Sequence, residues 1–279
     1  MESRDTMNMH AAWRPKTGDE PQMMNGAYHA IKPTTVSSTP SIMHSLAITP
    51  SEIKASREFV LSRSDFQIRL GTTADGQRSR VSMLIQRMYA WRGLLTHAPS
   101  RIDDRPNQLT LVASRGTTMF GTLTLGLDSP EGLCADELYA DEIAAARARG
   151  ARVCELTRLA IDPAFNSKEV LASIFHLAYI FGRLIHNMTD LFIEVNPRHV
   201  SFYQRMLGFR IAGEERICSR VDAPAVLLHL SLDEVDKQVS QHAGKPDAGS
   251  RSLYSYFFSE PEQKGLLRRL LADPSVLAV

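Results

Sequence analysis

The order of elements in this chain is decided between residues 153 and 209, where the sequence reads VCELTRLAID at 153–162 and VNPRHVSFYQRMLGF at 195–209. The first stretch predicts a strand over Val153–Ile161, and the residues that follow predict a long, broadly apolar helix over Lys168–His186. A buried strand, Leu191–Val195, then leads into a short helix within the second stretch. Strand, long helix, strand and short helix on a mixed sheet predict one three-layer domain.

The flanking sequence extends this alternation in both directions. Before residue 153 we expect a strand over Phe66–Leu70, an amphipathic helix over Asp75–Trp91 stopped by Gly93, strands over Leu109–Ala113 and Met119–Leu127 joined by a hairpin at Ser114–Gly116, and a helix over Asp136–Arg149 ended by Gly150. After residue 195 we expect the helix Arg198–Leu207, closed by Gly208, and strands near Phe209–Ala212 and Ala225–Leu230. The predicted class is α/β (α+β).

The two ends of the chain differ from this core in composition. Residues 1–62 are rich in Ser, Thr, Pro, Met and Gly and predict an irregular or disordered arm, with a short helix over Thr49–Leu61. Residues 63–235 are the expected globular domain, and residues 236–279 predict a linker and a helical tail. In the tail we expect the aromatic run Tyr254–Phe258 to cover the core.

The bulk properties exclude several classes of protein. The formal net charge of +1 gives no global field for nucleic acid or an anionic membrane. Three cysteines without CxxC spacing argue against a disulfide framework or a metal site and fit a reducing compartment. The N-terminus has no apolar signal region, and the most apolar stretch, Val170–Ile185, contains His176 and Arg183. We therefore expect a cytoplasmic protein without a membrane span.

Two stretches resemble the GNAT superfamily of acyltransferases. The segment 195–209 resembles the GNAT segment in which a strand ends at Asn, a helix carries a Tyr, and Gly-Phe follows. The segment Cys154–Asp162 resembles the Glu-x-x-Arg strand of acyl-homoserine lactone synthases, which are GNAT-fold enzymes fed by acyl carrier protein. The chain also resembles relatives of these synthases, the long-chain N-acyl amino acid synthases, over Asp65–Leu232 and again in the tail at Arg251–Phe258.

This resemblance implies a mixed, mostly antiparallel sheet with a splayed pair of central strands. Transfer from a thioester to an amine needs a slot for pantetheine, a path for the amine's proton, oxyanion stabilisation and a proton for the thiolate. The resemblance places the slot between the strand ending at Ile161 and the strand Leu191–Val195. The backbone groups of Leu159, Ala160 and Ile161 are then expected to pair with the pantetheine amides.

Three side chains are the expected catalytic groups. By resemblance, Glu155 is the general base, directly or through water, and Tyr203 protonates the departing thiolate. Arg158 is expected to fix a substrate carboxylate or a neighbouring acid. On a regular strand Glu155 and Arg158 point to opposite faces, and a bulge would change that. The alternatives are a structural Glu/Arg pair beneath the site and a core tyrosine.

The turn before the long helix bears on the donor. CoA-using GNAT enzymes usually have a glycine-rich turn here, whereas this chain has no glycine over 165–170. One phosphate held by Ser167 and Lys168 fits phosphopantetheine on acyl carrier protein better than the pyrophosphate of CoA, which stays open. Alternatively, Ser167 only caps the helix and Lys168 is solvated. Asn196 is expected either to bond the pantetheine or to shape the turn before Pro197.

The acceptor side is inferred from the lactone synthases. Arg87 and Trp91 lie four residues apart on one helix face and are expected to line the substrate side of the site, together with Thr124. Those synthases place an arginine after Gly-Thr, and its absence beside Gly121-Thr122 favours an amino acid over S-adenosylmethionine. Candidates for an acyl tunnel, whose spacing is more often that of plain core, are Leu125, Leu127, Phe175, Tyr179, Phe192 and Phe202.

The sequence thus predicts an N-acyltransferase that moves a long acyl chain from acyl carrier protein, or from acyl-CoA, to the amine of an amino acid. No tightly bound cofactor is expected. Acidic acyl carrier protein would meet a basic patch, for which the candidates are Lys168, Arg183, Arg198 and Arg205. The alternatives are an acetyl-CoA-dependent N-acetyltransferase and a non-catalytic module that binds acyl thioesters.

Overall fold

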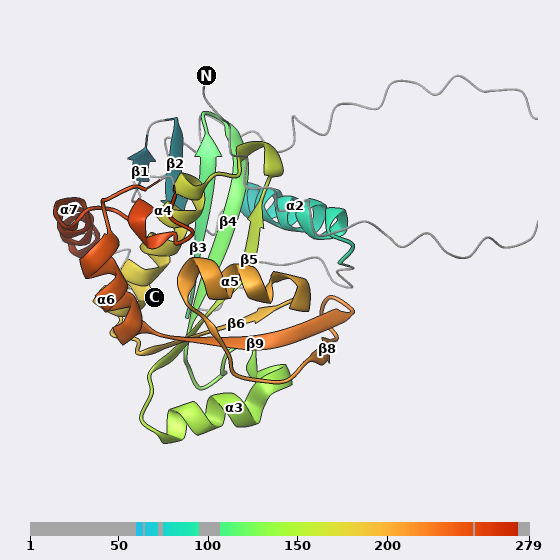
Figure 1. Cartoon of the computed structure of the whole chain (residues 1–279). Helices are drawn as coiled ribbons and strands as arrows, with labels where there is room; N and C mark the ends of the chain where they lie inside the picture. The colour runs from blue at the N-terminus through green and yellow to red at the C-terminus, as the bar shows by residue number, and fades with distance from the viewer. Residues whose placement is uncertain (1–59, 64, 72–74, 95–106, 248, 273–279) are drawn as a thin grey trace, which may run out of the picture.

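A computed structural model describes residues 60–63, 65–71, 75–94, 107–247 and 249–272 (Figure 1). The strands are β1 (Val60–Arg63), β2 (Phe66–Leu70), β3 (Gln108–Arg115), β4 (Thr118–Leu127), β5 (Val153–Ile161), β6 (Asp190–Val195), β7 (Arg210–Ile211), β8 (Arg216–Cys218) and β9 (Ala223–Ser231). The α-helices are α2 (Asp75–Trp91), α3 (Asp136–Ala148), α4 (Lys168–Tyr179), α5 (Val200–Leu207), α6 (Leu232–His242) and α7 (Glu260–Leu271). Short helical segments are η2 (Pro163–Phe165), η3 (Ile180–Ile185, a π-helix), η4 (Pro197–His199) and η5 (Tyr254–Tyr256).

The described strands form one mixed sheet in the order β1-β2-β3-β4-β5-β6-β9-β7, with β8 added to β9. All neighbouring strands run antiparallel except β5 and β6, which are joined through α4 and run parallel. A parallel pair needs such a crossover connection, which accounts for the long helix between them. The class and the strand–helix–strand–helix centre are as the sequence predicts.

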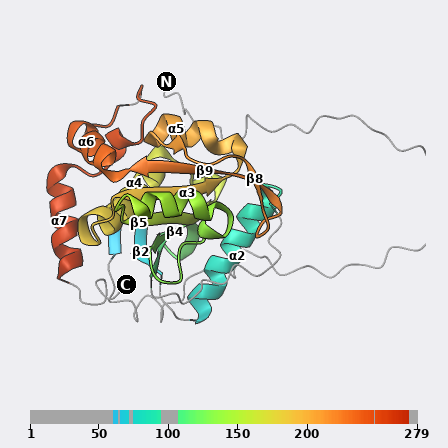
Figure 2. The same ribbon diagram turned by 90° about the horizontal axis from the view of Figure 1, so that it is seen from below.

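Helices cover both faces of this sheet, which makes the three layers (Figures 1 and 2). On one face, the buried side of α4 packs with α6, α7 and the tail on residues such as Leu125 and Leu156. On the opposite face, α2 packs on Val112 and Ala160, and α3 packs on Val153 and Phe192. We refer to these as the α4 face and the α2 face.

The C-terminal tail is part of the core. Tyr254, Phe257 and Phe258 are buried, as predicted for the aromatic run. The fully buried His176 of α4 holds this segment, because its Nδ1 accepts the N–H of Phe258 at 2.8 Å and its Nε2 lies 2.8 Å from Gln263 Oε1. The rings of Phe257 and Phe258 stack on its imidazole.

Several predicted boundaries differ from the structure. Val60 and Leu61 belong to β1, which pairs with β2, so the expected helix over Thr49–Leu61 is wrong at its end, and the rest of it and of the arm lies outside the described residues. The linker does not begin near 236, because α6 continues to His242 and buries Leu232 and Val235. The hairpin turn falls at Gly116, where φ is +55°, rather than at Ser114–Arg115, which remain in β3.

The long helix and the second β-hairpin also depart from expectation. The segment predicted as one helix to His186 changes from α4 to the π-helix η3 at Ile180. The strand β8 was not predicted, since its three residues carry no alternation. No helix of the described residues is long and apolar enough to cross a membrane.

Replacing His176 by Leu is expected to destabilise the tail. The Phe258 N–H would be left buried without an acceptor, which costs about 1–3 kcal/mol. Burial lowers the pKa of His176 to about 3, so the imidazole is neutral in the folded chain, whereas it titrates near 6.5 when unfolded. The unfolded state therefore binds more protons below about pH 6.5, and the wild type loses this part of its stability as the pH falls toward 3.

Urea unfolding at several pH values tests this expectation. The difference in free energy of unfolding between wild type and His176→Leu should be largest above pH 7 and should decrease as the pH is lowered. The exposed His242→Ala serves as the control and should stay within about 0.5 kcal/mol of wild type. A gap that does not change with pH would contradict a neutral, buried His176.

Candidate active site

The strands β5 and β6 separate partway along their length. Their pairing consists of Val153 with Asp190, Cys154 with Leu191, and Glu155 with Phe192. Beyond Glu155, β5 continues to Ile161, and among the described strands this stretch pairs with β4 alone. The edge of β5 that faces β6 therefore presents backbone groups without a strand partner over residues 156–161, which is where the splayed pair was predicted.

A bulge occurs in β5 at this opening. The register with β4 shifts between Thr122 and Thr124, and Arg158 has the positive φ of 55° that is rare for a residue with a side chain. The extra residue turns the Arg158 side chain to the α2 face, where its Nη1 donates to Gln108 Oε1 at 3.0 Å. Glu155 also lies on this face, so the bulge places the two predicted catalytic side chains on the same side of the sheet.

A cavity lies at the mouth of the opening. It contains about 440 Å³ of space between atoms and is lined by the strand β5, the start of α4 and the helix α5. We call it the entrance cavity; its lining residues are Arg92, Leu159, Ile161, Asn166, Leu171, His199, Phe202 and Tyr203. Leu159 and Ile161, predicted to hold the pantetheine, thus line it, whereas Ala160 points to the α2 face and packs against α2.

A second, apolar cavity lies deeper on the α4 face, with about 420 Å³ of space between the atoms that line it. We call it the apolar cavity. Leu125, Phe175 and Tyr179, three of the tunnel candidates, line it, but Leu127, Phe192 and Phe202 do not. Its far wall comes from Leu232 and Val235 of α6 and from Tyr254 and Phe257 of the tail, none of which was predicted to line a site.

Tyr203 lies between the two cavities. It lines the entrance cavity, and its ring packs edge-on against Phe175 and Phe209, which line the apolar cavity. Burial raises the pKa of its phenol to about 12. The hydroxyl therefore stays protonated at neutral pH, as a donor to a thiolate must be.

The three side chains predicted to bind the phosphate and the pantetheine form hydrogen bonds within the chain instead. Ser167 caps α4 by accepting the N–H of Val170 at 3.2 Å, and Lys168 donates to the carbonyl of Ser250 at 3.1 Å. Asn196 caps η4 and donates to the carbonyl of Pro224 at 3.1 Å. These are the structural roles that the sequence left open, and ligand binding by the three side chains stays a prediction.

The predicted acceptor residues are dispersed. Arg87 donates to Asp162 Oδ2 at 2.7 Å, at the end of β5, and Trp91 is largely exposed. Thr124 is buried on the α2 face, where its hydroxyl lies 2.9 Å from that of Thr110. The structure brings Thr124 near Glu155 through adjacent strand positions, but it brings neither Arg87 nor Trp91 into contact with either of them.

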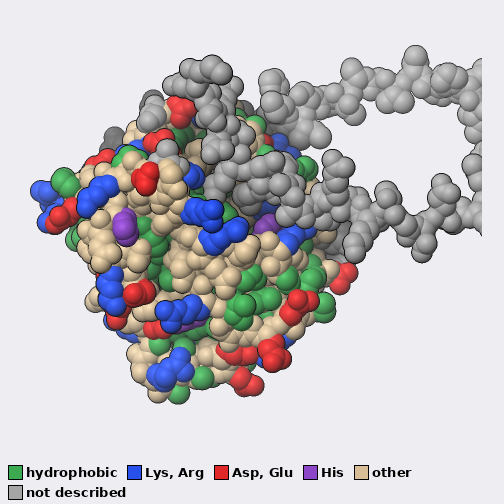
Figure 3. Space-filling model, in the orientation of Figure 1, with side chains coloured by type: hydrophobic (Ala, Val, Ile, Leu, Met, Phe, Trp, Pro, Cys, Tyr) green, Lys and Arg blue, Asp and Glu red, His purple; other side chains and the backbone are tan. Residues whose placement is uncertain are grey.

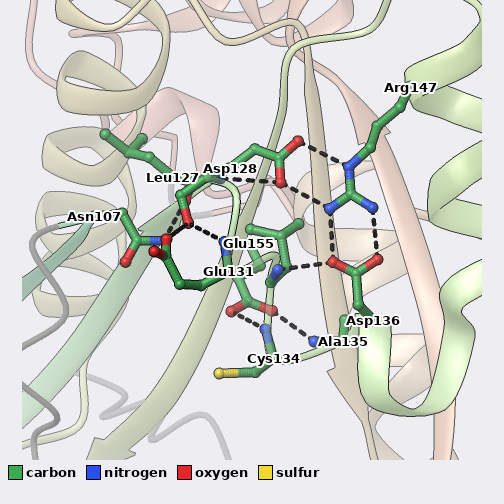
Figure 4. Close-up of polar contacts among 11 residues, drawn as sticks. Asn107, Leu127, Asp128, Glu131, Cys134, Ala135, Asp136, Arg147 and Glu155 are labelled. Atoms are coloured by element: carbon green, nitrogen blue, oxygen red, sulfur yellow. Dashed lines mark hydrogen bonds and ion pairs between the residues drawn. The ribbon is translucent and has the colours of Figure 1, made fainter.

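Glu155 is 2% exposed, and its carboxylate accepts hydrogen bonds from the loop before α3 (Figure 4). One carboxylate oxygen accepts the N–H of Cys134 at 2.8 Å, and the other accepts the N–H of Ala135 at 3.0 Å. Gly126 makes room for it, since a Cβ there would lie 3.0 Å from Glu155 Cγ. Burial raises the pKa of the Glu155 carboxyl, and the two N–H bonds oppose that shift. Glu155 lines neither cavity, and its role as general base stays a prediction.

The same loop is held from its other end by Arg147 of α3. Its guanidinium bonds both oxygens of Asp128, at 2.7 and 2.8 Å, and both oxygens of Asp136, at 2.6 and 2.7 Å. Asp136 in turn accepts the N–H of Leu133 (Figure 4). The loop at residues 133–135, beside the open strands on the α2 face, is therefore held in place from both ends.

Sequence reasoning missed a charged group on this face. Arg220, in the turn between β8 and β9, bonds Glu194 of β6, Glu137 of α3 and the carbonyl of Cys134. A glutamate within the apolar strand sequence LFIEV was a usable signal for Glu194. Nothing in the sequence around Arg220 indicated its position. Among the described residues, no group of side chains has the composition of a metal site.

Comparisons with known proteins agree with this geometry. A solved structure of FeeM, an N-acyl amino acid synthase from uncultured soil microbes, is 26% identical, with a TM-score of 0.56, over 61% of this chain and 93% of that one. The acyl-homoserine lactone synthase LasI is 14% identical over 63% and 91% of the two chains, with a TM-score of 0.40. An aminoglycoside N(6')-acetyltransferase from Legionella pneumophila is 16% identical over 64% and 98%, with a TM-score of 0.42. No curated protein sequence matched the chain.

The mixed sheet with a parted central pair and a cavity at the opening defines a GNAT-type N-acyltransferase. The family model of the N-acyl amino acid synthase FeeM matches residues 80–231. The chain belongs to this family of N-acyl amino acid synthases, as the resemblance of its central stretches implied.

Replacing Glu155 by Gln is expected to destabilise the fold, whatever it does to catalysis. Gln offers one acceptor and one donor, so either Cys134 or Ala135 would lose its acceptor and face an NH₂ group, at a cost of about 1–3 kcal/mol. Urea unfolding measures the change, and Glu234→Gln, on the exposed side of α6, is the control. Equal stability of Glu155→Gln and wild type would show that the carboxylate does not anchor the loop.

Proposed function

We propose that the enzyme transfers a long acyl chain from acyl carrier protein to the amine of an amino acid. The proposal depends on one observation: the parting of β5 and β6 opens onto the entrance cavity, and a second, apolar cavity lies behind it. A phosphopantetheine arm that pairs with the open edge of β5 would deliver its thioester at Tyr203, with the acyl chain continuing into the apolar cavity. An acetyl group would leave that cavity unfilled.

The lining of the apolar cavity supports an unbranched hydrocarbon as its occupant. Apart from the hydroxyls of Tyr179 and Tyr254, its side chains are aliphatic, aromatic or thiol. Both of those hydroxyls are directed elsewhere, because Tyr179 donates to Asp236 at 2.7 Å and Tyr254 donates to the carbonyl of Leu207 at 2.8 Å.

Acyl carrier protein is the preferred donor on two grounds. The turn before α4 lacks the glycines that let a backbone wrap a pyrophosphate. In addition, the exposed Arg198 and Arg205 lie on η4 and α5, beside the entrance cavity, and Arg92 lines it. On the face shown in Figure 3, Lys and Arg side chains form several separate groups, with Asp and Glu side chains between them. Arg183 is no docking residue, because it pairs with Asp233 and Asp236 of α6.

In this proposal the residues act in sequence at the opening. The amine attacks the thioester carbonyl from the α2 face, where Arg158 lies on the bulge and is assigned to the acceptor's carboxylate. The carbon–sulfur bond breaks as the carbon–nitrogen bond forms, and the Tyr203 hydroxyl gives its proton to the departing thiolate. The acceptor's ammonium group loses one proton before the attack, and the attacking nitrogen gives a second proton to the phenolate, which restores the phenol.

The donor is tested by comparing acyl transfer from hexadecanoyl-acyl carrier protein and from hexadecanoyl-CoA to a mixture of amino acids. Mass spectrometry identifies the N-acyl product, so the head group and the chain are determined together. We expect the carrier-protein thioester to be used at least about tenfold more efficiently, and Arg205→Glu to reduce that preference. Equal or better use of the CoA thioester would reject the carrier protein as donor, and acetyl transfer alone would reject the long chain.

Filling the apolar cavity should shorten the accepted chain. Ala178 lines the cavity, and Ala178→Leu would place a larger side chain in its space. We expect transfer of a hexadecanoyl chain to fall about tenfold or more, while transfer of a hexanoyl chain changes little, because one methylene contributes about 0.8 kcal/mol. Ala144→Leu, on the exposed side of α3, is the control. Parallel loss of both chain lengths would mean that the cavity does not hold the acyl group.

A further inference from the structure

The charged group around Arg220 lies where the two central strands part, on the α2 face. Glu194 is two residues beyond Phe192, the last residue of β6 that pairs with β5, and it lies on the same face as Phe192 because side chains alternate along a strand. Glu155 is the last paired residue of β5 on that face. Glu194 therefore follows directly on the closed part of the sheet, at the opening itself.

The two oxygens of Glu194 have different surroundings. Oε2 accepts from Arg220, whose guanidinium also bonds Glu137 and the carbonyl of Cys134. Oε1 is buried and has no hydrogen-bond partner in the part of the chain that the structure describes. A buried carboxylate oxygen without a donor is costly unless a ligand or water supplies one. Glu155 has no such oxygen, since each of its two accepts a backbone N–H.

We propose that Glu194 is the carboxylate that receives the proton of the acceptor's ammonium group, with Arg220 holding it in place and Glu155 serving as the anchor of the adjoining loop. The inference rests on the proposed function and names a further catalytic residue for it. The ammonium of an amino acid supplies the N–H donor that Oε1 lacks.

The proton balance of the step is as follows. One proton passes from the ammonium nitrogen to Glu194 Oε1, which frees the nitrogen lone pair. That pair forms the carbon–nitrogen bond while the carbon–sulfur pair leaves with sulfur. The thiolate is protonated by Tyr203, and the attacking nitrogen releases its second proton to the tyrosinate. Glu194 returns its proton to solvent when the amide leaves.

The surroundings of Glu194 suit it to this task near neutral pH. Burial raises the pKa of its carboxyl to about 7, and Arg220 opposes the shift. The charged or titratable groups that face it come from β5, β8, the β8–β9 turn and α3; they are Glu155, Cys218, Arg220, Glu137 and Tyr139. Glu155 and Glu137 add to the upward shift as like charges. A base whose pKa lies near the working pH is the efficient one.

The test measures thiol release from the acyl thioester against pH, with a saturating amino acid, for wild type, Glu194→Gln, Glu194→Asp and Glu137→Gln. In the wild type, kcat/KM should decrease as the pH is lowered below about 7, because Glu194 becomes protonated. We call this decrease the acid limb of the pH profile. The rate of Glu194→Gln at pH 7 should be lower than that of the wild type by about a hundredfold or more. Its pH profile should lack the acid limb, and its residual rate should rise at higher pH as the free amine forms. Glu194→Asp keeps the carboxylate and should keep the limb at reduced rate.

Glu137→Gln is the matched control, because it removes the other carboxylate partner of Arg220 and leaves Glu194 intact. It should stay within about threefold of wild type at pH 7 and keep the decrease in rate at low pH, moved to a lower pH because one like charge beside Glu194 is lost. A Glu194→Gln enzyme within that range, or loss of the acid limb in Glu155→Gln instead, would overturn the assignment. If Glu194→Gln does not fold, the Glu194→Asp and Glu137→Gln profiles decide, since unchanged Glu194→Asp kinetics would also overturn it. Thiol release that needs an amine other than an amino acid would reject the proposed acceptor, and the same variants then test Glu194 with that amine.

Discussion

The structure depends on how β5 and β6 end their pairing. Two parallel strands bond over three residue pairs and then separate, with β5 continuing for a further six residues to Ile161. An open strand edge inside a domain is stable only if its backbone groups find other partners. Here the opening is surrounded by α4, α5 and the turn at Asn196, and the entrance cavity lies within it. The same feature that weakens the sheet thus provides the groups that can bind an extended pantetheine arm.

The two faces of the sheet differ in polarity at this opening. The α4 face is apolar and is covered by the tail. The tail is bonded to His176, and its residues Tyr254 and Phe257 form part of the wall of the apolar cavity. The α2 face carries the charges, with the loop at 133–135 fixed by Glu155 and Arg147 and the turn at Arg220 fixed by three bonds. The acyl chain and the zwitterionic amino acid of the proposed reaction need opposite environments, and in this proposal the sheet separates them except where its strands part.

Much of the fold follows from periodicity in the sequence, and the remainder depends on contacts between distant residues. The strand 153–161 and the helix 75–91 were predictable because their patterns are long and regular. The extent of α6 was not, since its polar composition resembles a linker until Leu232 and Val235 are seen to be buried. The bulge at Arg158 could be named as a possibility only, because a positive φ at a residue other than glycine is imposed by tertiary packing. For the site, Glu155, Arg158 and Tyr203 lie near the point where β5 and β6 part, but Glu155 and Arg158 line neither cavity, and the roles of all three stay predictions. Arg220 comes from a turn whose place depends on the pairing of β8 with β9.

The central claim is that the thioester arm binds along the open edge of β5. Amide hydrogen exchange, measured with and without a non-hydrolysable thioether analogue of acyl-pantetheine, tests it most directly. We expect slower exchange in β5 over residues 156–161 and at the start of α4, with little change in β1 and β2 at the far edge of the sheet. Protection confined to other strands, with residues 156–161 exchanging as in the free enzyme, would contradict it.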